Sequence, residues 1–84
     1  MNEQEMKNLI TTLIVPLASK PEVIEIEINE GDRFVEFTAY VDRSDLGRLI
    51  GVGGVTVTAI RNLVYSARFE GAKRVRLSIE PRHA

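Results

Sequence analysis

The sequence predicts a single small α+β domain, in which helices cover one face of a three-stranded sheet. Three observations support this prediction. The chain has 84 residues, enough for one domain with a modest two-layer core. Its apolar residues recur at three- and four-residue steps in some segments and alternate strictly in others, which indicates helices and strands respectively. These segments follow the order α-β-β-α-α-β, which suits a two-layer sandwich.

The first predicted element is an amphipathic helix that begins near Asn2 or Glu3. Pro16 is expected to distort its last turn, and Pro21 argues against continuation past Lys20. The apolar face of this helix is formed by Met6, Leu9, Ile10, Leu13, Ile14 and Leu17.

Strict alternation of apolar and polar residues predicts three strands. Residues 23–28 and 34–41 alternate on either side of a turn from Asn29 to Asp32, so they should form an antiparallel hairpin. Residues 74–80 alternate in the same way and predict the third strand. The inward positions are Ile24, Ile26, Ile28, Val35, Phe37, Ala39, Val41, Val75, Leu77 and Ile79.

Two helices are predicted between the second and third strands. Asp42 or Ser44 can cap the first of them, and Asp45 lies near its positive end. The second is expected to stop at Gly71. The apolar positions are Leu46, Leu49 and Ile50 in the first helix and Val57, Ile60, Leu63, Val64 and Ala67 in the second, where Thr58, Arg61, Asn62 and Tyr65 should be more exposed.

The composition argues against several functional classes. The chain has no cysteine, so it has neither a disulfide framework nor a thiolate metal site. It shows no signal peptide and no apolar run near the roughly 20 residues that span a bilayer, so we expect a cytoplasmic protein with no membrane span. His83 lies in an expected frayed tail, and Glu25, Glu27 and Glu36 look like solvated strand residues. We therefore expect no catalysis, no cofactor, no metal and no small-molecule substrate.

The formal net charge of −1 hides a division between the two halves of the chain. Residues 1–42 carry a net charge of −6 and residues 43–84 a net charge of +5. A polyanion would be drawn to the second half. The alternative is that the two halves pair across the fold and cancel.

A glycine cluster lies in the basic half, where the stretch RLIGVGGVTVTAIR places Gly51, Gly53 and Gly54 directly before a predicted helix. Such a loop offers unpaired N–H groups and a helix dipole, and residues without a Cβ let a phosphate oxygen approach closely. The P-loop motif does not fit, because its lysine and hydroxyl are missing. The dinucleotide motif would need glycine at Thr56 and a preceding strand. The loop therefore indicates a contact with a phosphate backbone, or else it is merely a tight turn.

The run from Ile50 to Gly54 between two helices resembles the I-G-x-x-G loop of the KH domain family. The element order matches the type II arrangement of that family. The stretches KPEVIEIEI at 20–28, DLGRLIG at 45–51 and TAIRNLV at 58–64 are similar to small bacterial RNA-binding proteins that consist of one KH domain. The resemblance implies a single type II KH domain over residues 1–84.

By this resemblance the protein binds single-stranded RNA, in post-transcriptional regulation or as an RNA chaperone. Gly51, Val52, Gly53 and Gly54 would clamp the sugar-phosphate backbone of about four unpaired nucleotides, while bases lie along an apolar groove. The groove candidates, each of which is alternatively an ordinary core residue, are Leu46, Ile50 and Val57.

Arginines near the loop are candidates for phosphate contacts. Arg48 and Arg61 could reach a bound strand, and the alternative for both is a solvated surface. Arg74 and Arg76 are weaker candidates, because they fit the exposed face of the last strand. The five aromatic residues form no ladder along the sequence, so binding that relies on base stacking is not expected.

The loop departs from the family pattern, because Val52 and Gly53 occupy positions that commonly carry a basic or polar residue. Binding should therefore be weak, with a dissociation constant on the order of micromolar, and sensitive to salt. The departure leaves open a degenerate KH fold that serves as a protein-protein interaction scaffold. The resemblance also implies a homodimer, or a heterodimer with a second, larger KH-containing RNA-binding protein, and an influence on cell shape.

Overall fold

The computed structural model describes residues 1–67, 69, 71 and 73–83, so Arg68 and Glu70, which count in the charge of the second half, lie outside the described residues. Its main elements follow the predicted order. They are α1 (Glu3–Ile14), β1 (Glu25–Glu30), β2 (Phe34–Val41), α2 (Leu46–Ile50), α3 (Val55–Ser66) and β3 (Arg74–Pro81). Short 3-10 turns occupy Val15–Leu17, Pro21–Val23, Arg43–Asp45 and Val52–Gly54.

Helix α1 begins where the sequence predicts, because Asn2 forms a capping box with Glu5. The Asn2 side chain accepts a hydrogen bond from the Glu5 amide at 2.8 Å, and the Glu5 carboxylate accepts one from the Asn2 amide at 3.0 Å. The helix ends at Ile14, and the chain tightens into a 3-10 turn around Pro16, which confirms the predicted distortion.

The three strands form one sheet in the order β1-β2-β3. Strand β1 pairs antiparallel with β2, and β3 pairs parallel with the other side of β2. The hairpin turn is shorter than the predicted span from Asn29 to Asp32, because β1 continues to Glu30, which lies opposite Val35. A hydrogen bond from the Gly31 amide to the Phe34 carbonyl at 2.8 Å closes it. Strand β3 is left with one free edge.

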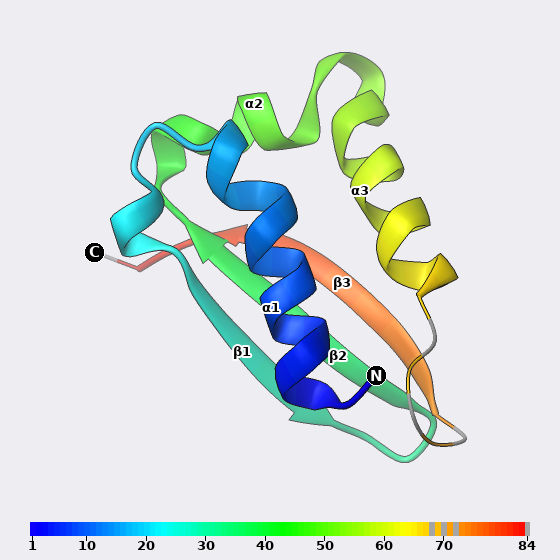
Figure 1. Ribbon diagram of the computed structural model, residues 1–84. Coiled ribbons are helices and arrows are strands. Elements are labelled where there is room, and N and C mark those ends of the chain that lie inside the picture. Colours follow the sequence, from blue (N-terminus) through cyan, green and yellow to red (C-terminus); the bar gives the residue numbers. More distant parts are fainter. Residues whose placement is uncertain (68, 70, 72, 84) are drawn as a thin grey trace.

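The helices α1, α2 and α3 lie over one face of the sheet, as predicted (Figure 1). Register explains which strand residues meet them: Phe37 lies opposite both Ile28 and Leu77, so alternate positions of all three strands share the covered face. The core formed there consists of Met6, Ile10, Ile14, Val35, Phe37, Ala39, Val41, Leu49, Ile60, Val64 and Leu77. This arrangement matches the α+β fold that the resemblance to type II KH domains implies.

Helix α3 differs from the prediction at two positions. The apolar pattern places Leu63 on the buried face, but its side chain is 55% exposed. At 3.6 residues per turn, Leu63 is rotated by about 60° beyond Ile60, away from the arc that faces the sheet. The helix also ends at Ser66 rather than at Gly71, because Ala67 already has an extended backbone with φ −71 and ψ 142.

Asp45 precedes α2 as its N-cap residue, near the positive end as predicted, and its carboxylate has a further role that the sequence did not indicate. Its side chain is 1% exposed and accepts hydrogen bonds from the Ser19 amide at 2.8 Å, the Ser19 hydroxyl at 2.7 Å and the Lys20 amide at 3.1 Å. The hydrogen bonds from Ser19 hold the pKa of the Asp45 carboxyl below its usual range. Asp45 thus ties the segment after α1 to the start of α2. Of the two predicted caps, Asp42 and Ser44, the structure has Asp42: its side chain accepts a hydrogen bond from the Ser44 amide at 3.0 Å and caps the 3-10 turn Arg43–Asp45 that leads into α2.

Candidate nucleic-acid interface

The glycine loop, Gly51–Gly54, connects α2 and α3 at a sharp bend. The segments Arg43–Ile50 and Val52–Ser66 meet at 50°. Three of the four loop residues have positive φ: Gly51 at 79°, Gly53 at 65° and Gly54 at 78°. Side chains other than glycine rarely adopt such angles. Between these glycines the Val52 side chain is 94% exposed, so the loop presents its backbone to solvent ahead of α3.

Only part of the predicted set of free amides is available to a ligand. The Gly51 amide donates to the Gly47 carbonyl at 2.8 Å, and the Gly54 amide donates to the Gly51 carbonyl at 3.1 Å. The expectation that the loop offers unpaired N–H groups therefore fails at Gly51 and Gly54, because the N–H groups of these two residues close the turn itself. The amides of Val52 and Gly53 donate no hydrogen bond within the described part of the chain. They lie beside the positive end of the α3 dipole.

The surroundings of the glycines leave space above the middle of the loop. A Cβ atom on Gly51 would lie 2.9 Å from the Thr56 amide nitrogen, so this glycine is required by close packing. A Cβ atom on Gly53 would meet nothing within 4 Å. The open side of the loop is therefore at Gly53, whose own amide and the neighbouring Val52 amide are the two that donate no hydrogen bond to any described residue.

The three groove candidates differ in how far they face solvent. Ile50 is 40% exposed at the end of α2, next to the glycine loop. Leu46 is half-buried and packs against the core. Val57 is 7% exposed, which confirms the alternative interpretation of this residue as ordinary core. Ile50 is the candidate with the largest apolar surface open to a ligand.

The two arginine candidates are also placed differently. Arg48 is exposed in the last turn of α2. Arg61 is half-buried, and its Nε donates to the Leu77 carbonyl on the free edge of β3 at 3.1 Å. One turn further along α3, the Tyr65 hydroxyl accepts from the Leu77 amide at 3.2 Å. Arg61 therefore joins α3 to β3 through its Nε atom. Only the two terminal nitrogens of its guanidinium remain available for a contact with phosphate.

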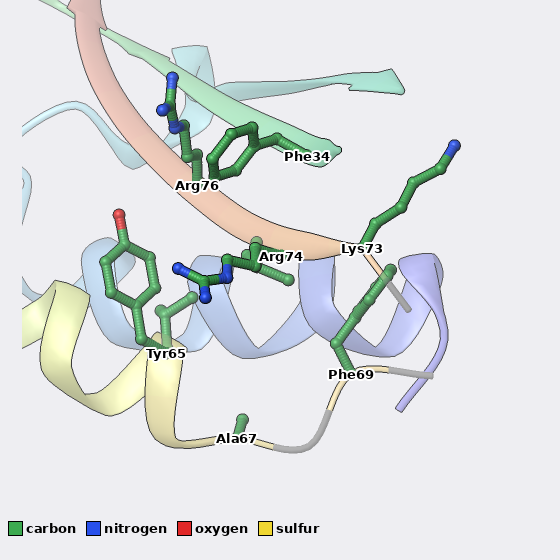
Figure 2. Close-up of a pocket in the computed structure, with 9 residues that line it drawn as sticks. Phe34, Tyr65, Ala67, Phe69, Lys73, Arg74 and Arg76 are labelled. Carbon is green, nitrogen blue, oxygen red and sulfur yellow. The ribbon is translucent and has the colours of Figure 1, made fainter. Parts of the chain in front are cut away.

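A second feature escapes the sequence analysis: a cavity of about 480 Å³ between the end of α3 and the start of β3 (Figure 2). We call it the aromatic-cationic cavity. Its lining includes three aromatic and three cationic side chains: Phe34, Tyr65, Phe69, Lys73, Arg74 and Arg76. Phe34 belongs to β2, Tyr65 to α3, and Arg74 and Arg76 to β3, whereas Phe69 and Lys73 lie between α3 and β3. No periodicity links residues so far apart, which is why the spacing of the aromatics gave no signal.

The described residues show neither a cluster of metal ligands nor a single helix that could span a membrane. No group of three or more histidine, aspartate or glutamate side chains is placed to hold a metal ion. No single helix there is long and apolar enough to cross a membrane, and the segments Arg43–Ile50 and Val52–Ser66 reach that length only together, across their 50° bend.

Comparison with known proteins agrees with this fold. The family model of the KhpA/KhpB KH domain matches residues 7–79. The chain is 45% identical over 76 residues to RNA-binding protein KhpA of Lactiplantibacillus plantarum, covering 90% of this chain and 89% of the relative. It is 41% identical over 75 residues to RNA-binding protein KhpA of Streptococcus pneumoniae serotype 4, covering 89% and 94%. It is 33% identical over 79 residues to RNA-binding protein KhpA of Bacillus subtilis, covering 94% and 98%. The chain belongs to the KhpA/KhpB family of KH domains.

Proposed function

We propose that this protein is a non-catalytic single-stranded RNA-binding protein that holds the sugar-phosphate backbone at its glycine loop. The observation that carries the proposal is the pair of uncommitted amides at Val52 and Gly53, exposed at the positive end of α3. The relatives named above are RNA-binding proteins. We further propose that the protein acts in the cytoplasm, either in post-transcriptional regulation or as an RNA chaperone. Residues 1–84 form the one KH domain that does so.

In this proposal the backbone of the loop does most of the binding. The two amides donate to a phosphate oxygen, and Gly53 lets the phosphate approach without a steric barrier. Arg48 adds a charge beside the loop, and the exposed part of Ile50 offers apolar contact to a sugar or base. With no lysine in the loop, affinity rests on few charges. Binding should therefore be on the order of micromolar, and sequence selectivity should be low.

The double variant V52D/G53D tests the loop directly. It places two negative charges where the phosphate is expected, and the open space around Gly53 accommodates the new side chain. The matched control is V52N/G53N, which has nearly the same shape and the same backbone demand at Gly53 but no charge. Asparagine and aspartate both tolerate positive φ better than most residues.

The measurement is fluorescence anisotropy of a labelled four-nucleotide RNA at low salt, with circular dichroism to check folding. We expect V52D/G53D to lose binding and V52N/G53N to keep most of it. Equal affinities of the two folded variants would show that no phosphate sits at the loop.

A second candidate function, the interaction scaffold, is supported by an exposed apolar stripe on the outer side of α3. Val55 is 70% exposed and Leu63 is 55% exposed, and Val52 extends the stripe onto the loop. By the family resemblance the partner is a second copy of this chain or a larger KH-containing RNA-binding protein. The variant V55K/L63K distinguishes this function: light scattering should show loss of a dimer while the four-nucleotide RNA still binds. A parent that is monomeric, and that binds RNA as V55K/L63K does, would count against the stripe as an interface.

A further inference from the structure

The aromatic-cationic cavity lies at the opposite end of α3 from the glycine loop. The loop directly precedes Val55, whereas Tyr65 and Ala67, which line the cavity, lie at and just beyond the other end of the helix. A helix of 12 residues is about 18 Å long. The cavity is thus a separate place on the surface, within reach of a strand that is several nucleotides long.

The shape of the cavity suits a planar group. Its volume of about 480 Å³ lies in the range of small-molecule sites. Phe34 and Arg76 lie on one side of the β3 ribbon, and Tyr65 and Phe69 lie on the other side, with the guanidinium of Arg74 directed towards Tyr65 (Figure 2). The guanidinium carbon of Arg76 is already stacked 3.8 Å from the centre of the Phe34 ring. Flat π-surfaces therefore stand on either side of the β3 strand, and a base can lie against one of them.

The charge of the lining suits an anion. Among the described residues none of the lining side chains is acidic, and three are cationic. Lys73 is paired with Glu30 at 3.0 Å. The ion pairs that the structure gives within the described ranges leave the guanidiniums of Arg74 and Arg76 without a carboxylate partner. Arginine binds phosphate through paired N–H donors, and its plane also stacks on aromatic rings and bases.

The free edge of β3 argues against an extended peptide as the occupant. A peptide that adds a strand needs a row of unpaired N–H and C=O groups. At Leu77 both groups are already used, the amide by Tyr65 and the carbonyl by Arg61. A ligand in the cavity therefore meets side chains, which are aromatic and cationic, rather than an open strand edge. A base with an attached phosphate matches both kinds of side chain.

We propose that the aromatic-cationic cavity is a second RNA contact, which holds one further nucleotide of a strand already engaged at the glycine loop. The inference rests on the proposed function for the identity of the ligand as RNA. The base lies against the aromatic rings, and Arg74 and Arg76 contact its flanking phosphates. Because a KH loop engages about four nucleotides, an RNA of four nucleotides occupies one of the two places, whereas one of ten nucleotides reaches both.

The test compares RNAs of four and ten nucleotides on three proteins by fluorescence anisotropy at low salt. The variant R74Q/R76Q removes both free guanidiniums. The control K7Q/R43Q removes the same amount of charge from α1 and from the 3-10 turn before α2. We expect R74Q/R76Q to weaken binding of the ten-nucleotide RNA by about tenfold, the scale of one stacked base, and to leave the four-nucleotide RNA within about twofold of the control. Equal loss on both RNAs, or no loss beyond the control, overturns the proposal.

A second measurement separates this proposal from the one for the loop. In V52D/G53D, uridine monophosphate at millimolar concentration should still shift the NMR amide signals of Tyr65 and Val75, and R74Q/R76Q should abolish those shifts. If V52D/G53D has no effect on either RNA while R74Q/R76Q weakens the longer one, the loop proposal fails and the cavity stands. Shifts confined to residues outside the cavity in the parent protein refute the cavity.

Discussion

Replacing Gly51 by alanine should be one of the most damaging changes in the loop. Gly51 has φ 79 and ψ 170, a backbone region that is essentially restricted to glycine and that costs other residues about 1–3 kcal/mol. The new Cβ would also lie 2.9 Å from the Thr56 amide nitrogen, a backbone atom that cannot rotate away. Strain and overlap together should lower the free energy of unfolding by about 3 kcal/mol or more.

The matched comparison is G53A. Gly53 has φ 65 and ψ 16, so alanine there costs about 1–2 kcal/mol for the left-handed backbone, and its Cβ meets nothing within 4 Å. Urea unfolding followed by far-UV circular dichroism measures both variants against the parent. G51A should also melt about 12–24 °C below the parent. Equal losses in G51A and G53A would refute the argument that close packing on Thr56 fixes Gly51.

Three further predictions concern a buried carboxylate, two positions of α3 and the effect of salt. Asp45→Asn should destabilise the protein at neutral pH. Because the pKa of Asp45 is lowered in the folded protein, the stabilisation that its carboxylate provides is present above the unfolded pKa of about 3.9 and is lost as pH falls through the folded pKa. Urea unfolding at several pH values should therefore show the unfolding free energies of the variant and the parent converging in acid. Leu63→Ala should cost less than about 0.5 kcal/mol in monomer stability, whereas Ile60→Ala should cost about 2–5 kcal/mol, by the same unfolding assay. RNA affinity should fall steeply between about 50 and 200 mM salt; an affinity independent of salt would exclude phosphate contacts.

Local sequence patterns were sufficient for most of the fold. Strands β1, β2 and β3 follow from the alternation of residues such as Val35 and Phe37, because a half-buried strand must alternate. The start of α1 follows from Asn2, since its capping partner lies only three residues away. These features depend on neighbours in the chain. The glycine loop is predictable for the same reason, because positive φ angles in consecutive residues require glycines in consecutive positions.

The features that the sequence could not supply depend on partners far along the chain. Asp45 is near a helix start, so local rules assign it to a dipole, but its partner Ser19 is 26 residues away. Arg61 fits the exposed face of a helix until β3 is placed beside it. Leu63 belongs to the apolar pattern of α3, but the sheet covers only part of the helix surface that carries this pattern, and Leu63 lies outside the covered part. The aromatic-cationic cavity brings together side chains that lie as far apart in the sequence as Phe34 and Arg76, and no spacing rule relates these residues.

The ion pairs and the placement of charges on the sheet bear on the two interpretations of the charge division. In the described residues, the ion pairs are Lys20 with Asp42 and Lys73 with Glu30, and only the second joins the acidic half to the basic half. On the face of the sheet away from the helices, Glu25 and Glu27 stand on β1, while Arg74 and Arg76 stand on β3. Two strand spacings separate β1 from β3, about 10 Å, which is close to the screening length at about 0.1 M salt. Glu36 of β2 stands on the same face directly opposite Arg76, but the described residues show no ion pair between the two side chains. The acids therefore weaken the attraction of the arginines for RNA without pairing with them. Under the proposed function, an approaching strand is attracted to the side of β3 and α3, where the glycine loop and the aromatic-cationic cavity both lie.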